Sequence, residues 1–151
     1  MNRHDARMEY WAEFFVAPED TVTAESEPAV GADGGPAALP VDYDPEAAMA
    51  AWQALFANTS VRSRWRRTAP PEPAEATHDG CRVLVVPDPL VTHLARADRA
   101  QRERVAHAWV RLRRASGEDM STSDAVAHLT ALSSLATHAR THGRRLYAYM
   151  N

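Results

Sequence analysis

The chain has 151 residues, of which 45% are hydrophobic and 25% charged, as in an ordinary globular domain. Its formal net charge is −3, and its single cysteine excludes an internal disulfide and a multi-cysteine metal cluster. No stretch approaches the roughly 18 to 20 apolar residues of a membrane-spanning helix, and glutamates rather than an apolar run follow the basic N-terminus. We therefore expect one cytoplasmic domain over residues 1–151.

Charge is distributed unevenly along the chain, and all 17 basic residues are arginine. Residues 1–60 contain 11 acidic residues and 2 arginines, whereas residues 61–151 contain 9 acidic residues and 15 arginines. The two halves should attract each other. The acidic first part should also weaken any long-range attraction of the arginines toward nucleic acid.

The first half of the chain contains a strand and a helix separated by a long loop. Alternating residues predict a strand over 8–16, and an acidic stretch rich in glycine and proline predicts a loop or linker over about 18–40. Asp44 followed by Pro45 marks a helix start, and an apolar stripe continues to about Ala57. A proline-rich loop without helix or strand periodicity is expected over about 68–80.

The second half predicts a buried strand over 81–86 and then three helices. Asp88 is expected to cap the first helix, and Pro89 is expected in its first turn. This helix should end near Ala97 or Asp98. The second should span 99–115, and Ser121 should cap a third that begins near Thr122. Gly143 should end that helix, before a strand over 144–150 that alternates Leu146/Ala148/Met150 with Arg145/Tyr147/Tyr149.

These elements predict an α+β fold, because the helices are not interleaved singly with parallel strands. A small antiparallel sheet of the first, middle and C-terminal strands should be covered by about four helices. The residues expected to be buried lie on apolar helix stripes: Trp52, Trp109, Leu112, Leu129 and Leu132.

From Cys81 onward, the chain has a fixed order of features: a strand, Asp-Pro, a helix with His-Leu, a helix with one tryptophan, a long helix, a glycine and Leu-Tyr-Ala-Tyr. This order resembles that of small uncharacterised bacterial proteins of the YfbM-like type. The opening aromatic strand is also similar. The resemblance covers roughly the first 16 and the last 70 residues. It implies an α+β fold and a cytoplasmic bacterial protein, and it carries no catalytic residues across.

The sharpest local feature is the segment 61–67, in which four arginines surround a tryptophan: Arg62, Arg64, Trp65, Arg66 and Arg67. Phosphate contacts and base stacking would use these residue types. A pI near 6.1 argues against a nucleic-acid binder, so a protein partner is the favoured ligand of this segment. In the alternative that we keep open, Trp65 packs on the core and the arginines face solvent or the acidic loop.

Two further groups of residues have a functional and a structural interpretation. His138 and His142 share a helix face at metal-ligand spacing, with His107 or His128 as a third ligand, but a solvated polar face is the commoner fate of such histidines. Trp11, Phe15, Tyr147 and Tyr149 would form an aromatic patch if the first and last strands pair, although completing the core is the favoured interpretation.

The sequence contains no Gly-x-Ser-x-Gly motif, no phosphate-binding glycine loop and no paired carboxylates at a strand end. We therefore expect a small bacterial interaction protein, immunity- or accessory-like, that acts by surface complementarity without catalysis, cofactor or metal. A nucleic-acid-binding accessory protein that uses residues 61–67 is the alternative, and a metal-dependent enzyme is a third hypothesis.

Overall fold

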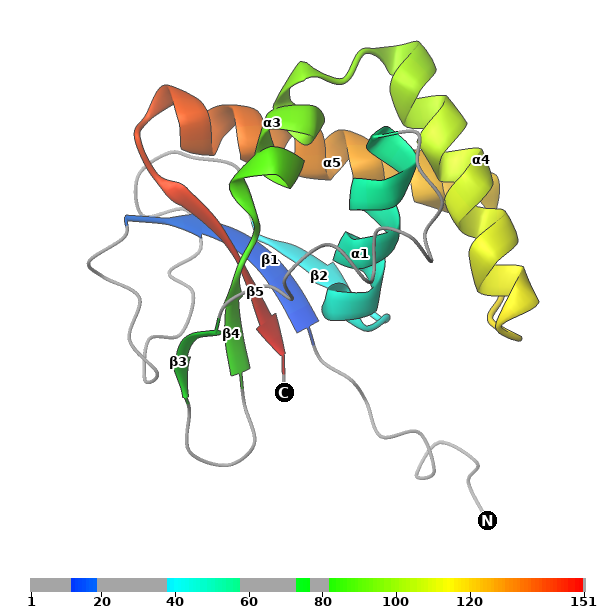
Figure 1. The fold of residues 1–151 in the computed structure, drawn as a ribbon, viewed down its shortest axis with the longest axis horizontal. Coiled ribbons are helices and arrows are strands. Elements are labelled where there is room, and N and C mark those ends of the chain that lie inside the picture. The colour runs from blue at the N-terminus through cyan, green and yellow to red at the C-terminus, as the bar shows by residue number, and fades with distance from the viewer. Residues whose placement is uncertain (1–11, 19–37, 58–72, 77–81, 151) are drawn as a thin grey trace.

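The computed structural model describes residues 12–18, 38–57, 73–76 and 82–150. In these ranges, helices lie on one side of a five-stranded antiparallel sheet with the order β2-β1-β5-β4-β3 (Figure 1). The strands are β1 (Ala12–Ala17), β2 (Leu39–Val41), β3 (Pro73–Ala76), β4 (Arg82–Val85) and β5 (Arg145–Met150). The helices are α1 (Pro45–Phe56), α3 (Asp88–Arg96), α4 (Arg99–Ala115) and α5 (Thr122–Thr141). The α+β class, with the first, middle and C-terminal strands in one antiparallel sheet, is therefore confirmed.

Strand β5 is the central strand of the sheet, with a paired strand on each edge and buried residues on both faces. It pairs with β1 from Ala12↔Met150 to Ala17↔Arg145, and with β4 on its other edge. Three successive residues of β5 are buried, namely Leu146, Tyr147 and Ala148. A strand exposed on one face would alternate buried and exposed residues instead.

Each long helix has the end signals that its sequence predicts, with one exception. Asp44 Oδ1 accepts from the Glu46 N–H at 3.0 Å, and Ser121 Oγ accepts from the Asp124 N–H at 3.0 Å. Asp98 begins α4 in a reciprocal capping box with Gln101. The prediction that Asp88 caps α3 is wrong: Pro87 holds the cap position, and Asp88 is the first helical residue.

Gly143 ends α5 in the left-handed conformation that its position predicts. Its φ is +61°, and the next N–H, that of Arg144, donates to the Ala139 carbonyl oxygen at 2.8 Å. This bond closes the last helical turn and reverses the chain into β5. The sheet and the long helix are thereby joined by a tight connection.

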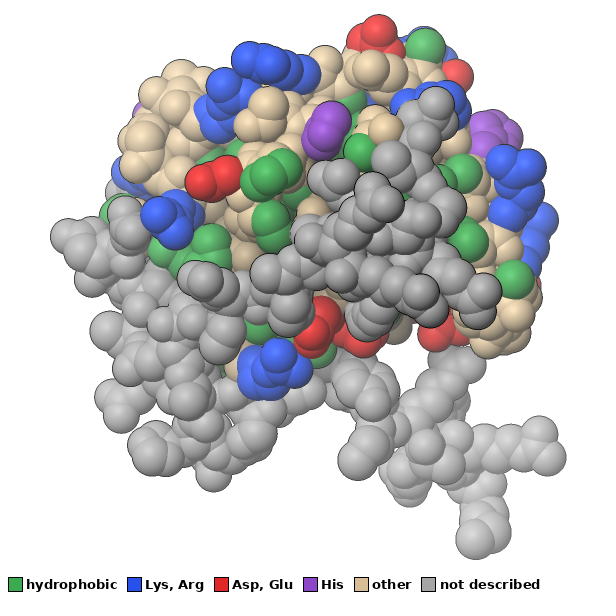
Figure 2. Space-filling view, viewed as in Figure 1, with side chains coloured by type: hydrophobic (Ala, Val, Ile, Leu, Met, Phe, Trp, Pro, Cys, Tyr) green, Lys and Arg blue, Asp and Glu red, His purple; other side chains and the backbone are tan. Residues whose placement is uncertain are grey.

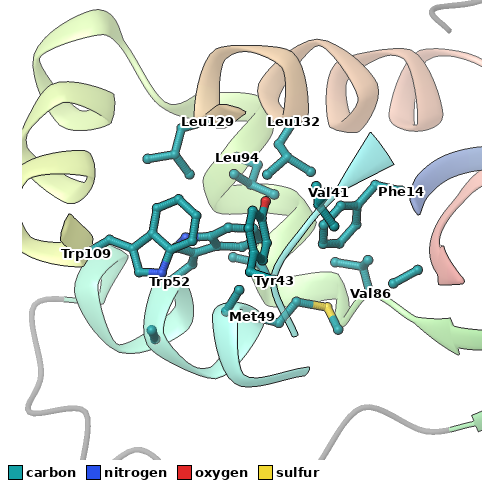
Figure 3. Packing of buried hydrophobic residues seen from close by; sticks show 14 of the residues in the cluster. Phe14, Val41, Tyr43, Met49, Trp52, Val86, Leu94, Trp109, Leu129 and Leu132 are labelled. Carbon is teal, nitrogen blue, oxygen red and sulfur yellow. The ribbon is translucent and has the colours of Figure 1, made fainter. Parts of the chain in front are cut away.

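The main core fills the space between the sheet and the helices (Figure 3). Trp52 and Trp109 lie edge to face there with ring centroids 5.1 Å apart, and Trp52 also contacts Phe14 of β1. Leu129 and Leu132 of α5 are fully buried, as predicted. Within the described residues, no helix combines the length and apolar character needed to cross a bilayer.

The described residues differ from the sequence-based predictions at three places. The loop expected over 18–40 ends in the edge strand β2, and the loop expected over 68–80 contains β3. Leu112 was expected on the inner face of α4 but is 37% exposed. It lines a hollow of about 380 Å³ between α1 and the end of α4, where α1 does not close over it.

Candidate functional site

The arginine-tryptophan segment 61–67 lies outside the described residues, as does Trp11 of the expected aromatic patch. The predicted roles of Arg62, Arg64, Trp65, Arg66 and Arg67 therefore stay predictions. The candidate sites within the described ranges lie on the helices α4 and α5 and on the sheet face opposite the helices.

Helix α4 presents a continuous basic stripe to solvent. Arg104, His107, Arg111 and Arg114 follow one another at steps of three and four residues, and all are exposed. Figure 2 shows basic side chains gathered at the edge of the molecule where α4 runs. We call these four residues the arginine stripe.

Little within the described residues neutralises the arginine stripe. Arg104 Nη1 donates to the Leu55 carbonyl oxygen at the end of α1, at 3.3 Å. The ion pairs of α4 use other arginines, Arg99 with Glu103 and Arg113 with Glu118. Arg111 and Arg114 form no ion pair with another described residue.

A second basic site is a groove between the α3–α4 junction and the C-terminal half of α5. It is an open groove of about 560 Å³, and its charged or titratable lining residues are Arg102, His138 and His142. The two imidazole rings stack with centroids 4.1 Å apart, and His142 Nδ1 lies 3.0 Å from the His138 carbonyl oxygen. The predicted shared face of these two histidines is therefore present in the fold.

The other two histidines proposed as metal ligands do not join this pair. His107 is exposed on the arginine stripe of α4, and the half-buried His128 packs against Tyr43, with ring centroids 5.6 Å apart. Burial there lowers the pKa of His128. Among the described residues, no group of three His, Cys, Asp or Glu side chains is placed to hold a metal ion.

The sheet face opposite the helices carries the aromatic side chains predicted to meet there. Phe15 of β1 is opposite Tyr147 of β5, and their rings stack with centroids 5.5 Å apart. Phe15 is 8% exposed and Tyr147 is 2% exposed, so these rings belong to a second, smaller core together with Val83. Glu13 is also buried on this face, which raises the pKa of its carboxyl group.

Several buried polar atoms around Tyr43 make no hydrogen bond with the described residues. They include Tyr43 Oη, Trp52 Nε1 and His128 Nδ1. Figure 3 shows the Tyr43 hydroxyl directed toward the leucines of α3 and α5. Burial raises the pKa of Tyr43, so its hydroxyl group is neutral around pH 7.

The replacement Tyr43→Phe is therefore expected to raise the free energy of unfolding by about 1 kcal/mol, because it removes a buried hydroxyl group that has no partner. Urea unfolding followed by circular dichroism measures the change. The control is Tyr149→Phe, at a half-buried tyrosine on the opposite sheet face. A loss of stability in Tyr43→Phe alone would show that the hydroxyl is hydrogen-bonded.

Comparisons with protein-family models, curated proteins and solved structures gave no match to this chain.

Proposed function

We propose that this protein is an interaction protein that binds an acidic protein surface through the arginine stripe of α4. The observation that carries the proposal is a row of exposed basic residues, with few ion-pair partners among the described residues, on a helix that is held in place by the core. The role is that of a small cytoplasmic bacterial accessory or immunity-like protein, which acts by surface complementarity. Residues 61–67 would extend the same basic chemistry.

The geometry of α4 suits surface recognition. Val105, Ala106, Trp109 and Val110 bury the inner face, so the outer face is fixed in direction. Arg104 and Arg114 are ten residues apart, or about 15 Å along a helix, which spans several side chains of a partner. Guanidinium groups form bidentate hydrogen bonds with carboxylates, which gives a specific geometry as well as attraction.

An acidic protein is favoured over nucleic acid because of the charge of the whole chain. The net charge is −3 and the pI is near 6.1, whereas a nucleic-acid-binding domain is usually strongly basic. A partner with a local acidic patch would need to meet only the arginine stripe. A long polyanion would also approach the acidic parts of the chain.

The test compares which proteins of the native cytoplasm bind to the immobilised wild type and to the double charge reversal Arg111→Glu/Arg114→Glu. The matched control is Arg96→Glu/Arg140→Glu, which changes the net charge equally at exposed positions outside the stripe. A protein that binds to both the wild type and the control is then purified, and its affinity is measured for the wild type, the stripe variant and the control. We expect the stripe variant to bind at least about tenfold more weakly at about 0.15 M salt, with the difference shrinking at about 1 M salt as the Debye length falls.

Two outcomes would overturn the proposal. Equal loss of binding in the stripe variant and its control would show only diffuse charge attraction. Retained material that disappears after nuclease treatment would instead support the nucleic-acid alternative, and its affinity should then fall steeply with salt.

A further inference from the structure

The groove between the α3–α4 junction and α5 is separate from the arginine stripe. Its arginine, Arg102, is nine residues from Arg111, or two and a half helical turns, which places the two on opposite sides of α4. The groove also has a different character, because it is concave and combines basic residues with hydroxyl groups. It therefore calls for a different ligand.

The lining of the groove favours an anion. Its titratable and charged members among the described residues are Arg102, His138 and His142, and none of the described lining residues is a carboxylate. Arg102 Nη1 donates to the Ala97 carbonyl oxygen at 2.8 Å, which holds the guanidinium group in place. A positioned arginine loses less conformational freedom when it binds an oxyanion than a freely moving one does.

The histidine pair adds donors from the opposite wall. When Nδ1 of His142 donates to the His138 carbonyl oxygen, Nε2 of the neutral ring is an acceptor, and it becomes a donor to an anion in the protonated ring. Protonation of an imidazole would then add a second positive charge to the groove, which an anion would stabilise. Arg102 comes from α4, and the histidines come from the last turn of α5 and its C-cap, so side chains converge on the groove from two helices.

Ser133 gives independent evidence of a ligand. It lines the groove and is 7% exposed, yet its hydroxyl group makes no hydrogen bond with the described residues. Its neighbours differ: Ser134 Oγ donates to the Thr130 carbonyl oxygen and Thr137 Oγ1 donates to the Ser133 carbonyl oxygen. Alanine would fit α5 better at position 133, because it has the higher helix propensity and leaves no polar atom unsatisfied.

We propose that this groove binds a small organic molecule that carries a phosphate group. Arg102 and the histidine pair hold the phosphate, and Ser133 donates its hydroxyl hydrogen to the ligand. A phosphate monoester presents three acceptor oxygens and close to two negative charges, so it satisfies donors from both walls better than a carboxylate does. The open groove of about 560 Å³ is larger than a phosphate ion, so it has room for an organic group beside the phosphate.

The test uses calorimetric titration of the full chain with phenyl phosphate and with inorganic phosphate. We expect phenyl phosphate to bind more tightly, because the groove has room for an organic group. Arg102→Gln should weaken binding by at least about tenfold, as expected for the loss of a charge-assisted contact. The control Arg140→Gln removes an exposed charge from α5 outside the groove lining and should change the dissociation constant by less than about twofold.

The variant Ser133→Ala separates a role in binding from a role in folding. It should bind phenyl phosphate several-fold more weakly while its thermal midpoint stays equal to or above that of the wild type. A purely structural serine would not show this combination. If Arg102→Gln fails to fold, Arg102→Lys keeps the charge without the bidentate fork and should still weaken binding.

The proposal is overturned if phenyl phosphate shows no saturable binding up to about 10 mM, since such an affinity is too weak for a specific small-molecule site. It is also overturned if Arg140→Gln weakens binding as much as Arg102→Gln, because the attraction would then be non-specific. Binding of inorganic phosphate alone, unaffected by Ser133→Ala, would likewise exclude a built site for a phosphate ester.

Discussion

Replacing Leu129 by alanine is expected to lower the free energy of unfolding by about 2 to 5 kcal/mol. Leu129 is fully buried on α5, where it belongs to the core between the helices and the sheet. The loss combines the transfer free energy of the removed methyl groups with the cavity that the packed surroundings cannot fill. Equilibrium unfolding in urea gives the value directly, and Leu132→Ala should behave in the same way because Leu132 is equally buried.

The control is Leu112→Ala, which deletes the same atoms from a helix at a 37% exposed position. Its loss should be clearly smaller than that of Leu129→Ala, because solvent can occupy the space and part of the side chain was never buried. Equal losses at the two positions, or a loss below about 0.5 kcal/mol at Leu129, would contradict the core described here.

The helices and the main strands were predictable because their signals are local. Asp44 and Ser121 cap helices through bonds to residues two or three positions away, and Gly143 adopts a positive φ that the end of a helix requires. The two faces of β5 also follow from its own alternation. None of these features needs information from a distant part of the chain.

The strands β2 and β3 could not be predicted because their stability comes from the neighbouring strands. Leu39–Val41 is too short to show a period, and Pro40 lacks the N–H group that a central strand would need. At the edge of the sheet, Pro40 opposite Glu13 is tolerated, since only one side of β2 pairs with β1. Pro73–Ala76 pairs similarly with β4, with a shift in register between Pro73 and Glu75.

The candidate sites also include features that were predictable from local sequence and features that were not. The exposed arginines of α4 were predictable from their helical spacing, and so was the shared face of His138 and His142 on α5. The groove was not, because Arg102 and the histidines are more than 30 residues apart and meet only through the packing of α3 and α4 on α5. The unpartnered hydroxyl of Ser133 has no sequence signal at all, since serine at that position of a helix is ordinary.

Trp52 is the residue that joins the sheet to two helices, and Trp52→Ala is expected to cost about 3 to 5 kcal/mol. Its indole is fully buried on α1, and ring centroids lie 5.8 Å from Phe14 of β1 and 5.1 Å from Trp109 of α4. Removing it therefore opens a cavity at the meeting point of three elements. Unfolding is best measured by circular dichroism, because the substitution itself alters tryptophan fluorescence.

The variant Trp52→Phe separates the contribution of ring packing to stability from that of the indole N–H group. Phenylalanine keeps an aromatic ring against Phe14 and Trp109, and it removes the Nε1–H group, which has no acceptor among the described residues. Its cost should therefore be less than about half that of Trp52→Ala, since lost ring volume is partly offset by relief of a buried unsatisfied donor. If Trp52→Phe is as costly as Trp52→Ala, the indole N–H donates a hydrogen bond that stabilises the fold, and Trp52 is a polar anchor rather than a packing residue.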